Sequence, residues 1–75
     1  MRQRIIKILN SIHPETDFTS INLIGEYLDS FDTVLLTAEL EKEFGIIIDG
    51  IKIRKTNFET IEKIISLVNE SELQK

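Results

Sequence analysis

Apolar residues recur at helical spacing near both ends of the chain. The first such stretch predicts a helix over residues 3–12, and Pro14 blocks its continuation because proline has no amide hydrogen to donate. Near the other end, Thr60 is a suitable N-cap for a helix that we expect to fray from about Ser71. The apolar faces are Ile5, Ile8, Leu9 and Ile12 in the first helix and Ile61, Ile64, Ile65 and Val68 in the last.

A middle helix is predicted from near Ser30 to about Phe44, with Gly45 as its stop signal. With successive residues about 100° apart, this helix carries two apolar stripes on opposite sides. One stripe is Thr33, Leu36, Thr37, Leu40 and Phe44, and the other is Phe31, Leu35 and Ala38. A helix in a small domain needs only one face for the core, so the second stripe requires a separate role.

The connections between these helices are less regular. Residues 15–28 show no clean period, and we interpret them as a long connection that still buries apolar side chains. Those side chains are Phe18, Ile21, Leu23 and Leu28. In residues 46–58, β-branched runs around Asp49-Gly50 form a hairpin signal, but a lone hairpin is marginal in water. The local pattern leaves the structure of this segment open.

Size and composition indicate one small domain spanning residues 1–75. The chain is 41% apolar, and its 14 isoleucines and 8 leucines are too many for a disordered protein. It has no cysteine, so neither disulfides nor a thiolate zinc site are available. Lys7 interrupts the N-terminal apolar segment, and no stretch approaches the ~20 apolar residues of a membrane span. We therefore expect a cytoplasmic domain without a signal peptide.

Charge is unevenly distributed along the chain. Residues 1–14 carry a balance of +3, residues 15–49 carry −8 and residues 50–75 carry +1, for a net charge of −4. The acidic middle segment would repel a phosphate backbone, so we expect no nucleic-acid partner. Its field could steer a basic protein partner, or these acids could form nothing more than a solvated face.

The residues available for catalysis are few. His13 is the one histidine, and neither a Ser-His-Asp set nor a conventional metal site can be built around it, so we expect it on the surface. Glu39 and Glu43 share a helix face, but an exposed acidic pair is usually solvated. The three glycines are too widely spaced to cradle a phosphate. We therefore expect no catalytic or metal-binding residues and no enzyme activity of the protein alone.

The segment from Tyr27 to Thr33 is the most informative one. Asp29 or Ser30 could cap the middle helix by accepting hydrogen bonds from unpaired N–H groups. A phosphate ester on Ser30 would also lie near the positive end of the helix dipole. Ser30 has no neighbouring base to activate it, so another enzyme would have to carry out that modification.

Three sequence blocks, together with Leu36, resemble the acyl carrier protein family: DSFDTV at residues 29–34, LEKEFGI at 40–46 and NFETI at 57–61. They occur in the family's order and spacing, and the similarity extends over most of residues 5–70. An Asp-Ser pair alone is weakly specific, whereas the blocks in combination are strongly so.

The resemblance implies an all-α fold, a small acyl-carrier-like bundle of three longer helices plus one short helix within residues 50–58. It implies that Ser30 receives 4′-phosphopantetheine from coenzyme A, catalysed by a magnesium-dependent phosphopantetheinyl transferase. The thiol of this arm would hold an acyl or aminoacyl group as a thioester, which suits a chain without cysteine. The resulting phosphoprotein would be a substrate of an acyl- or amino-acid-activating enzyme and of downstream acyl-transfer enzymes in biosynthesis.

Departures from the family's pattern favour a dedicated biosynthetic pathway over fatty-acid synthesis. Tyr27 stands where many members have glycine, which makes this segment more similar to discrete D-alanyl or peptidyl carrier proteins. Leu35 replaces an acid that fatty-acid carriers often have. The segment that contains Lys52, Arg54 and Lys55 is basic, whereas the same segment is usually acidic in those carriers.

The second apolar stripe then becomes a candidate partner surface beside Ser30. Apolar residues surrounded by acids suit a transient interface, because contact area supplies affinity and charge supplies orientation. The predicted surface is Asp29, Phe31, Asp32, Leu35, Ala38 and Glu39, with Glu43 on its rim. Alternatively, the long loop folds over this stripe through Ile21 or Leu23.

A second class of function remains open, namely a cofactor-free helical interaction module that uses the Phe31, Leu35 and Ala38 surface. Ser30 would then act as a helix cap, and Ser30→Ala would cost about 1 kcal/mol without loss of function. In a carrier, the same change abolishes function at nearly unchanged stability. For the carrier, we expect a monomer.

Overall fold

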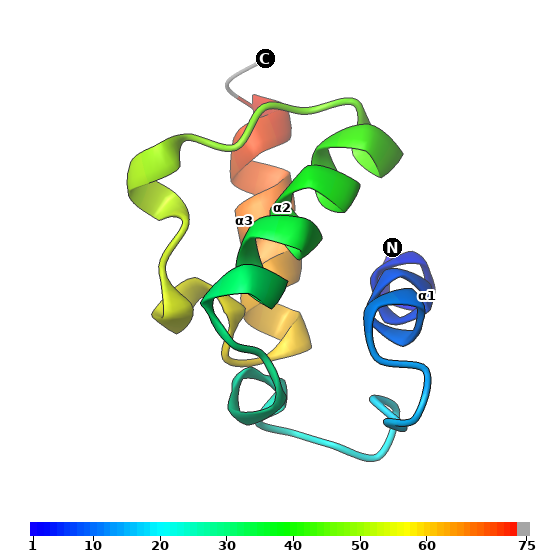
Figure 1. Cartoon of the computed structure of the whole chain (residues 1–75). Helices are drawn as coiled ribbons and strands as arrows, with labels where there is room; N and C mark the ends of the chain where they lie inside the picture. Colours follow the sequence, from blue (N-terminus) through cyan, green and yellow to red (C-terminus); the bar gives the residue numbers. More distant parts are fainter. Residues whose placement is uncertain (74–75) are drawn as a thin grey trace.

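Residues 1–73, which the computed structural model describes, form three α-helices and no strand (Figure 1). The helices are α1 over Arg2–Ile12, α2 over Ser30–Phe44 and α3 over Ile61–Leu73. Three short 3₁₀ helices lie in the connections, η1 over Ile24–Tyr27, η2 over Gly50–Lys52 and η3 over Lys55–Phe58. The all-α prediction is confirmed, with two 3₁₀ helices in place of the single short helix expected within residues 50–58.

The helix ends follow the local signals in the sequence. At the end of α2, Gly45 adopts the left-handed conformation with φ 62°, which glycine reaches without a side-chain clash. At the start of α3, the Thr60 hydroxyl oxygen accepts a hydrogen bond of 3.1 Å from the Lys63 amide. The prediction of fraying from Ser71 is wrong for residues 71–73, because Ser71 is buried and its hydroxyl donates to the Leu67 carbonyl. The same prediction for residues 74–75 lies outside the described residues.

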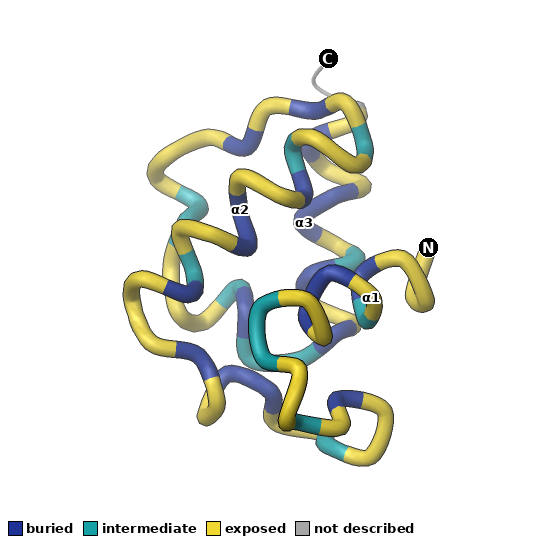
Figure 2. Tube along the Cα trace, turned by 45° about the vertical axis from the view of Figure 1, so that its right-hand side comes forward, coloured by how far each residue is buried: buried dark blue, intermediate teal, exposed yellow. Residues whose placement is uncertain are grey.

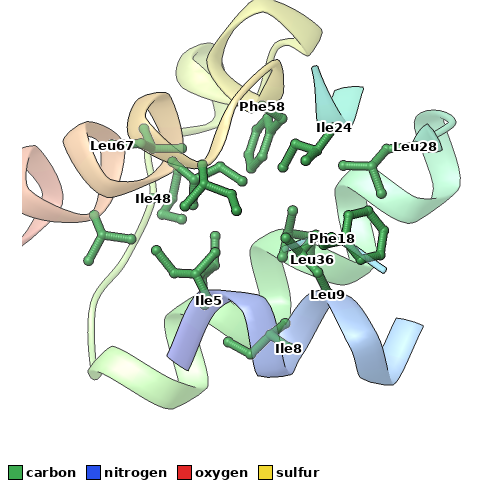
Figure 3. Packing of buried hydrophobic residues seen from close by; sticks show 14 of the residues in the cluster. Ile5, Ile8, Leu9, Phe18, Ile24, Leu28, Leu36, Ile48, Phe58 and Leu67 are labelled. Atoms are coloured by element: carbon green, nitrogen blue, oxygen red, sulfur yellow. The ribbon is translucent and has the colours of Figure 1, made fainter. Parts of the chain in front are cut away.

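One core unites the three helices (Figure 3). Helix α1 contacts both α2 and α3, and η3 also contacts both α2 and α3. The buried apolar residues are Ile5, Ile8, Leu9, Phe18, Ile24, Leu28, Leu36, Leu40, Ile46, Ile48, Phe58, Ile61, Ile64, Leu67 and Val68. The α1 face and the Leu36 stripe of α2 are thereby confirmed as core-facing, and the opposite stripe of α2 lies outside the core.

The long connection between α1 and α2 is exposed over much of its length and reaches the core at a few residues (Figure 2). Phe18 and Leu28 are buried as predicted, and Ile21 packs partly against the core. The prediction for Leu23 is wrong, because η1 turns Ile24 inward and leaves Leu23 48% exposed.

Gly25 allows η1 to approach the turn before α3 closely. Its amide donates a 3.2 Å hydrogen bond to the Glu59 carbonyl oxygen. A Cβ atom at this position would lie 3.0 Å from the Glu59 Cα and 3.2 Å from the Phe58 carbonyl oxygen. The absent side chain therefore lets two backbone segments pack directly against each other.

The hairpin suggested for residues 46–58 does not form. The Ile48 amide donates a 2.9 Å hydrogen bond to the Glu41 carboxylate, which ties this segment to α2. The Asp49 carboxylate then accepts a hydrogen bond from the Ile51 amide and starts η2. Side-chain and local contacts thus satisfy amide groups that a hairpin would have paired between strands.

Candidate functional site

Two aspartates build the start of α2 around Ser30. The Asp29 carboxylate accepts a 2.8 Å hydrogen bond from the Asp32 amide, and the Asp32 carboxylate accepts one of 3.2 Å from the Asp29 amide. This reciprocal capping box makes Asp29 the N-cap and Ser30 the first helical residue. Of the two caps that the sequence allows, the structure uses Asp29. Ser30 is exposed, and its hydroxyl takes no part in the capping box.

His13 links the end of α1 to this capping box. Its Nε2 atom lies 2.7 Å from a carboxylate oxygen of Asp32, and its Nδ1 atom lies 3.1 Å from a carboxylate oxygen of Glu15. The bond to Asp32 raises the pKa of His13 above its ordinary 6.5 and lowers the pKa of the Asp32 carboxyl below its ordinary value. The expectation of a surface histidine is therefore corrected: His13 is half-buried and supports the α2 start.

The burial of Asp32 also corrects its predicted place on a partner surface. The residue is 9% exposed, and its carboxylate is turned toward His13 and the Asp29 amide. The bond to the Asp29 amide is local, whereas His13 is 19 positions from Asp32 in the sequence, so local patterns do not reveal their pairing. Asp32 therefore helps to shape the helix tip and offers no free charge to a partner.

Ser30 borders an open pocket of about 450 Å³. We call this the Ser30 pocket; its lining is Leu28, Asp29, Ser30, Thr33, Val34, Ile53 and Lys55. Lys55 also borders a neighbouring pocket of about 280 Å³, with Leu23, Gly25, Glu26, Thr56 and Glu59. Sequence reasoning noted Lys55 only as a departure in charge, because nothing local indicates that η3 lies beside the start of α2.

The second stripe of α2 is uncovered. Phe31 is 69% exposed, Leu35 is 40% exposed and Ala38 is exposed. Val34, which sequence reasoning did not include, is 61% exposed between them and adds to the same region. We call these four residues the exposed stripe. The alternative that Ile21 or Leu23 covers it is wrong, since Ile21 packs on the core and Leu23 borders the smaller pocket.

The acids beside the exposed stripe differ in their surroundings. Glu43 accepts a 2.7 Å hydrogen bond from the Arg4 side chain, so its charge is already matched within the chain. Glu39 is exposed and borders a groove of about 250 Å³ between α1 and α2, together with Arg4 and Lys7. Among the acids predicted for the partner surface, Asp29 and Glu39 therefore remain accessible, and Glu43 is no longer a free rim charge.

Two other kinds of feature were sought in the described part of the chain, a metal site and a membrane span. Residues 1–73 contain no group of three or more His, Cys, Asp or Glu side chains that could hold a metal ion. None of the helices described here combines the length and the apolar character that crossing a membrane requires. Comparison of the chain with known protein families, curated proteins and solved structures finds no match. Function is therefore inferred from the residues of this chain.

Proposed function

We propose that this protein is an acyl or aminoacyl carrier protein that bears 4′-phosphopantetheine on Ser30 and serves a dedicated biosynthetic pathway. In this proposal it is a cytoplasmic monomer and a substrate of partner enzymes, with no catalytic activity of its own. The proposal draws on the resemblance of residues 29–34, 40–46 and 57–61 to the carrier family, and on the environment of Ser30.

The observation that carries the proposal is that Asp29, and not Ser30, caps the start of α2. Asp29 and Asp32 form the capping box without the Ser30 hydroxyl, which leaves this exposed hydroxyl available for modification. The attached phosphate would face the N-terminal end of a 15-residue helix, where the dipole favours negative charge. The Ser30 pocket offers room beside the attachment point. The residues present therefore fit the group.

Attachment requires a nucleophilic hydroxyl and an external catalyst. The Ser30 Oγ atom attacks the pyrophosphate phosphorus of coenzyme A that bears pantetheine. An Oγ–P bond forms, the P–O bond to adenosine 3′,5′-bisphosphate breaks, and the serine proton passes to a base of the transferase. Once attached, the arm supplies a thiol that carries an acyl or aminoacyl group as a thioester.

The exposed stripe supplies the docking contact for partner enzymes in this proposal. Phe31 and Leu35 are apolar side chains that the fold leaves in solvent within a few residues of Ser30. Glu39 and Asp29 provide accessible charge around them. Such a surface suits brief contact with the transferase, an activating enzyme and acyl-transfer enzymes in turn.

The test is the intact mass of the protein after incubation with coenzyme A, magnesium and a broad-specificity phosphopantetheinyl transferase. We expect the wild-type protein to gain one phosphopantetheinyl group and Ser30→Ala to gain none. Because Asp29 is the cap, Ser30→Ala should change the free energy of unfolding by less than about 0.5 kcal/mol. The matched change Asp29→Ala should cost about 1 kcal/mol.

The second candidate is the cofactor-free interaction module, which the 69% exposure of Phe31 favours independently of Ser30. That function needs the exposed stripe but no modified serine. Wild-type protein that stays folded and gains no mass would contradict the carrier proposal and favour this module. Full modification that Ser30→Ala abolishes would exclude the module as a sufficient account.

A further inference from the structure

We propose that the Lys55 ammonium group contacts the phosphate of the arm on Ser30, which makes Lys55 a positioning residue for the start of the arm. This inference rests on the proposed function and concerns the attached anion, whatever the cargo. Ser30 belongs to α2 and Lys55 to η3, yet both border the Ser30 pocket. A phosphate bonded to the Ser30 oxygen would therefore lie beside a pocket that Lys55 also lines.

The attached phosphate would lie near another negative charge in the pocket lining, and a cation would offset their repulsion. A phosphodiester on Ser30 places a negative charge next to the carboxylate of Asp29, which lines the same pocket. The apolar part of the lining, Leu28, Val34 and Ile53, offers no compensation. Among the described residues of the lining, Lys55 is the one cation. It can offset the repulsion between the phosphate and the carboxylate.

Of the two lysines in residues 50–58, Lys55 is the one that forms no ion pair with the described residues, and Arg54, which also forms none, does not line the Ser30 pocket. The Lys52 ammonium group lies 2.8 Å from a carboxylate oxygen of Glu70. Arg54 donates from its Nε atom to the Ile51 carbonyl oxygen at 2.9 Å. Lys55 takes part in none of the ion pairs formed within residues 1–73. Its charge is therefore free to meet an incoming anion.

The backbone of Lys55 is held in place relative to Ser30. Phe58, at the end of η3, is 1% exposed and anchors this short helix in the core. The Asn57 side chain donates a 2.7 Å hydrogen bond to the Lys52 carbonyl oxygen, and η3 contacts α2. The lysine stem is flexible, but its point of attachment is fixed by packing.

The experiment compares the melting temperature of each variant before and after attachment of the arm, with conversion checked by intact mass. Variants are Lys55→Met, Lys55→Arg and, as the matched control, Lys52→Met. We expect attachment to raise the melting temperature more, or lower it less, in the wild type than in Lys55→Met. The two changes in melting temperature should differ by about 2–4 °C at low salt. Lys55→Arg and Lys52→Met should show the same change on attachment as the wild type. At ~1 M salt, the difference between the wild type and Lys55→Met should disappear.

A second readout follows the phosphate itself. The phosphorus NMR resonance of the attached arm should move in Lys55→Met and stay near its wild-type position in Lys52→Met. Complete conversion with equal melting shifts and equal resonances in all variants would overturn the role of Lys55 and leave the carrier proposal intact. Absence of any mass gain in the folded wild type would overturn both.

Discussion

Leu35 and Leu36 are neighbours in α2 with opposite surroundings. Leu36 is completely buried, whereas Leu35 is 40% exposed on the face that also carries Phe31. Core positions lose several kcal/mol when truncated, while exposed positions away from caps and turns lose little. This pair therefore separates a role in folding from a role in partner contact.

We predict that Leu35→Glu lowers kcat/KM for modification of Ser30 by at least about tenfold, because a charge replaces an apolar contact at the interface. Circular dichroism should show unchanged helicity for this variant. Leu36→Ala, the buried control, should lose about 2–5 kcal/mol of stability. A loss of helicity in Leu35→Glu, or modification at the wild-type rate, would remove the exposed stripe from the partner surface.

His13 gives a second prediction at the residue scale, since the chain contains no other histidine. Its pKa is raised in the folded state, so the ion pair with Asp32 stabilises the protein fully below about pH 6.5. This contribution is lost as the pH rises through the folded value. It is also lost in acid, as the pH falls through the lowered pKa of Asp32.

We expect the wild type to lose about 1 kcal/mol of unfolding free energy between about pH 6 and about pH 9 that His13→Gln does not lose. Denaturant titrations of both proteins across this range provide the measurement. Parallel pH profiles for the two proteins would show that the His13–Asp32 contact contributes no stability.

At the scale of elements, two glycines test how the connections are packed. Gly25 lies where η1 meets the backbone of Phe58 and Glu59, whereas nothing lies within 4 Å of a Cβ atom placed on Gly50. Gly25→Ala should therefore destabilise the protein by about 1–3 kcal/mol through overpacking. Gly50→Ala should change stability by less than about 0.5 kcal/mol. Equal effects in urea unfolding would contradict the close contact of η1 with η3.

The elements also differ in how well the sequence predicts them. Helices α1 and α2 follow from local signals, such as the Ile5 face, Pro14 and Gly45, and their bounds agree with the prediction within a residue or two. The segment after α2 does not follow from local signals. Its β-branched run is held by the Glu41 carboxylate, a contact that local periodicity does not encode. Local periodicity also fails to predict that Leu23 is exposed, because the turn of η1 buries Ile24 instead.

At the scale of the whole molecule, the site is assembled from contacts that join distant parts of the chain. The position of Ser30 at the start of α2 could be predicted from the sequence, and so could the stripe beside it. The pairing of His13 with Asp32 and the approach of Lys55 to the Ser30 pocket could not, because both depend on tertiary packing. The acidic balance of residues 15–49 is partly matched internally by Arg4 and His13.

For the molecule as a whole, we propose that a small helical core presents Ser30, which does not cap α2, beside a pocket and an uncovered apolar stripe. The most direct measurement is the location of the mass gained from coenzyme A, mapped by proteolysis and tandem mass spectrometry of the modified protein. We predict one phosphopantetheinyl group, located on Ser30. Attachment at another serine, or folded protein that gains no mass, would contradict it.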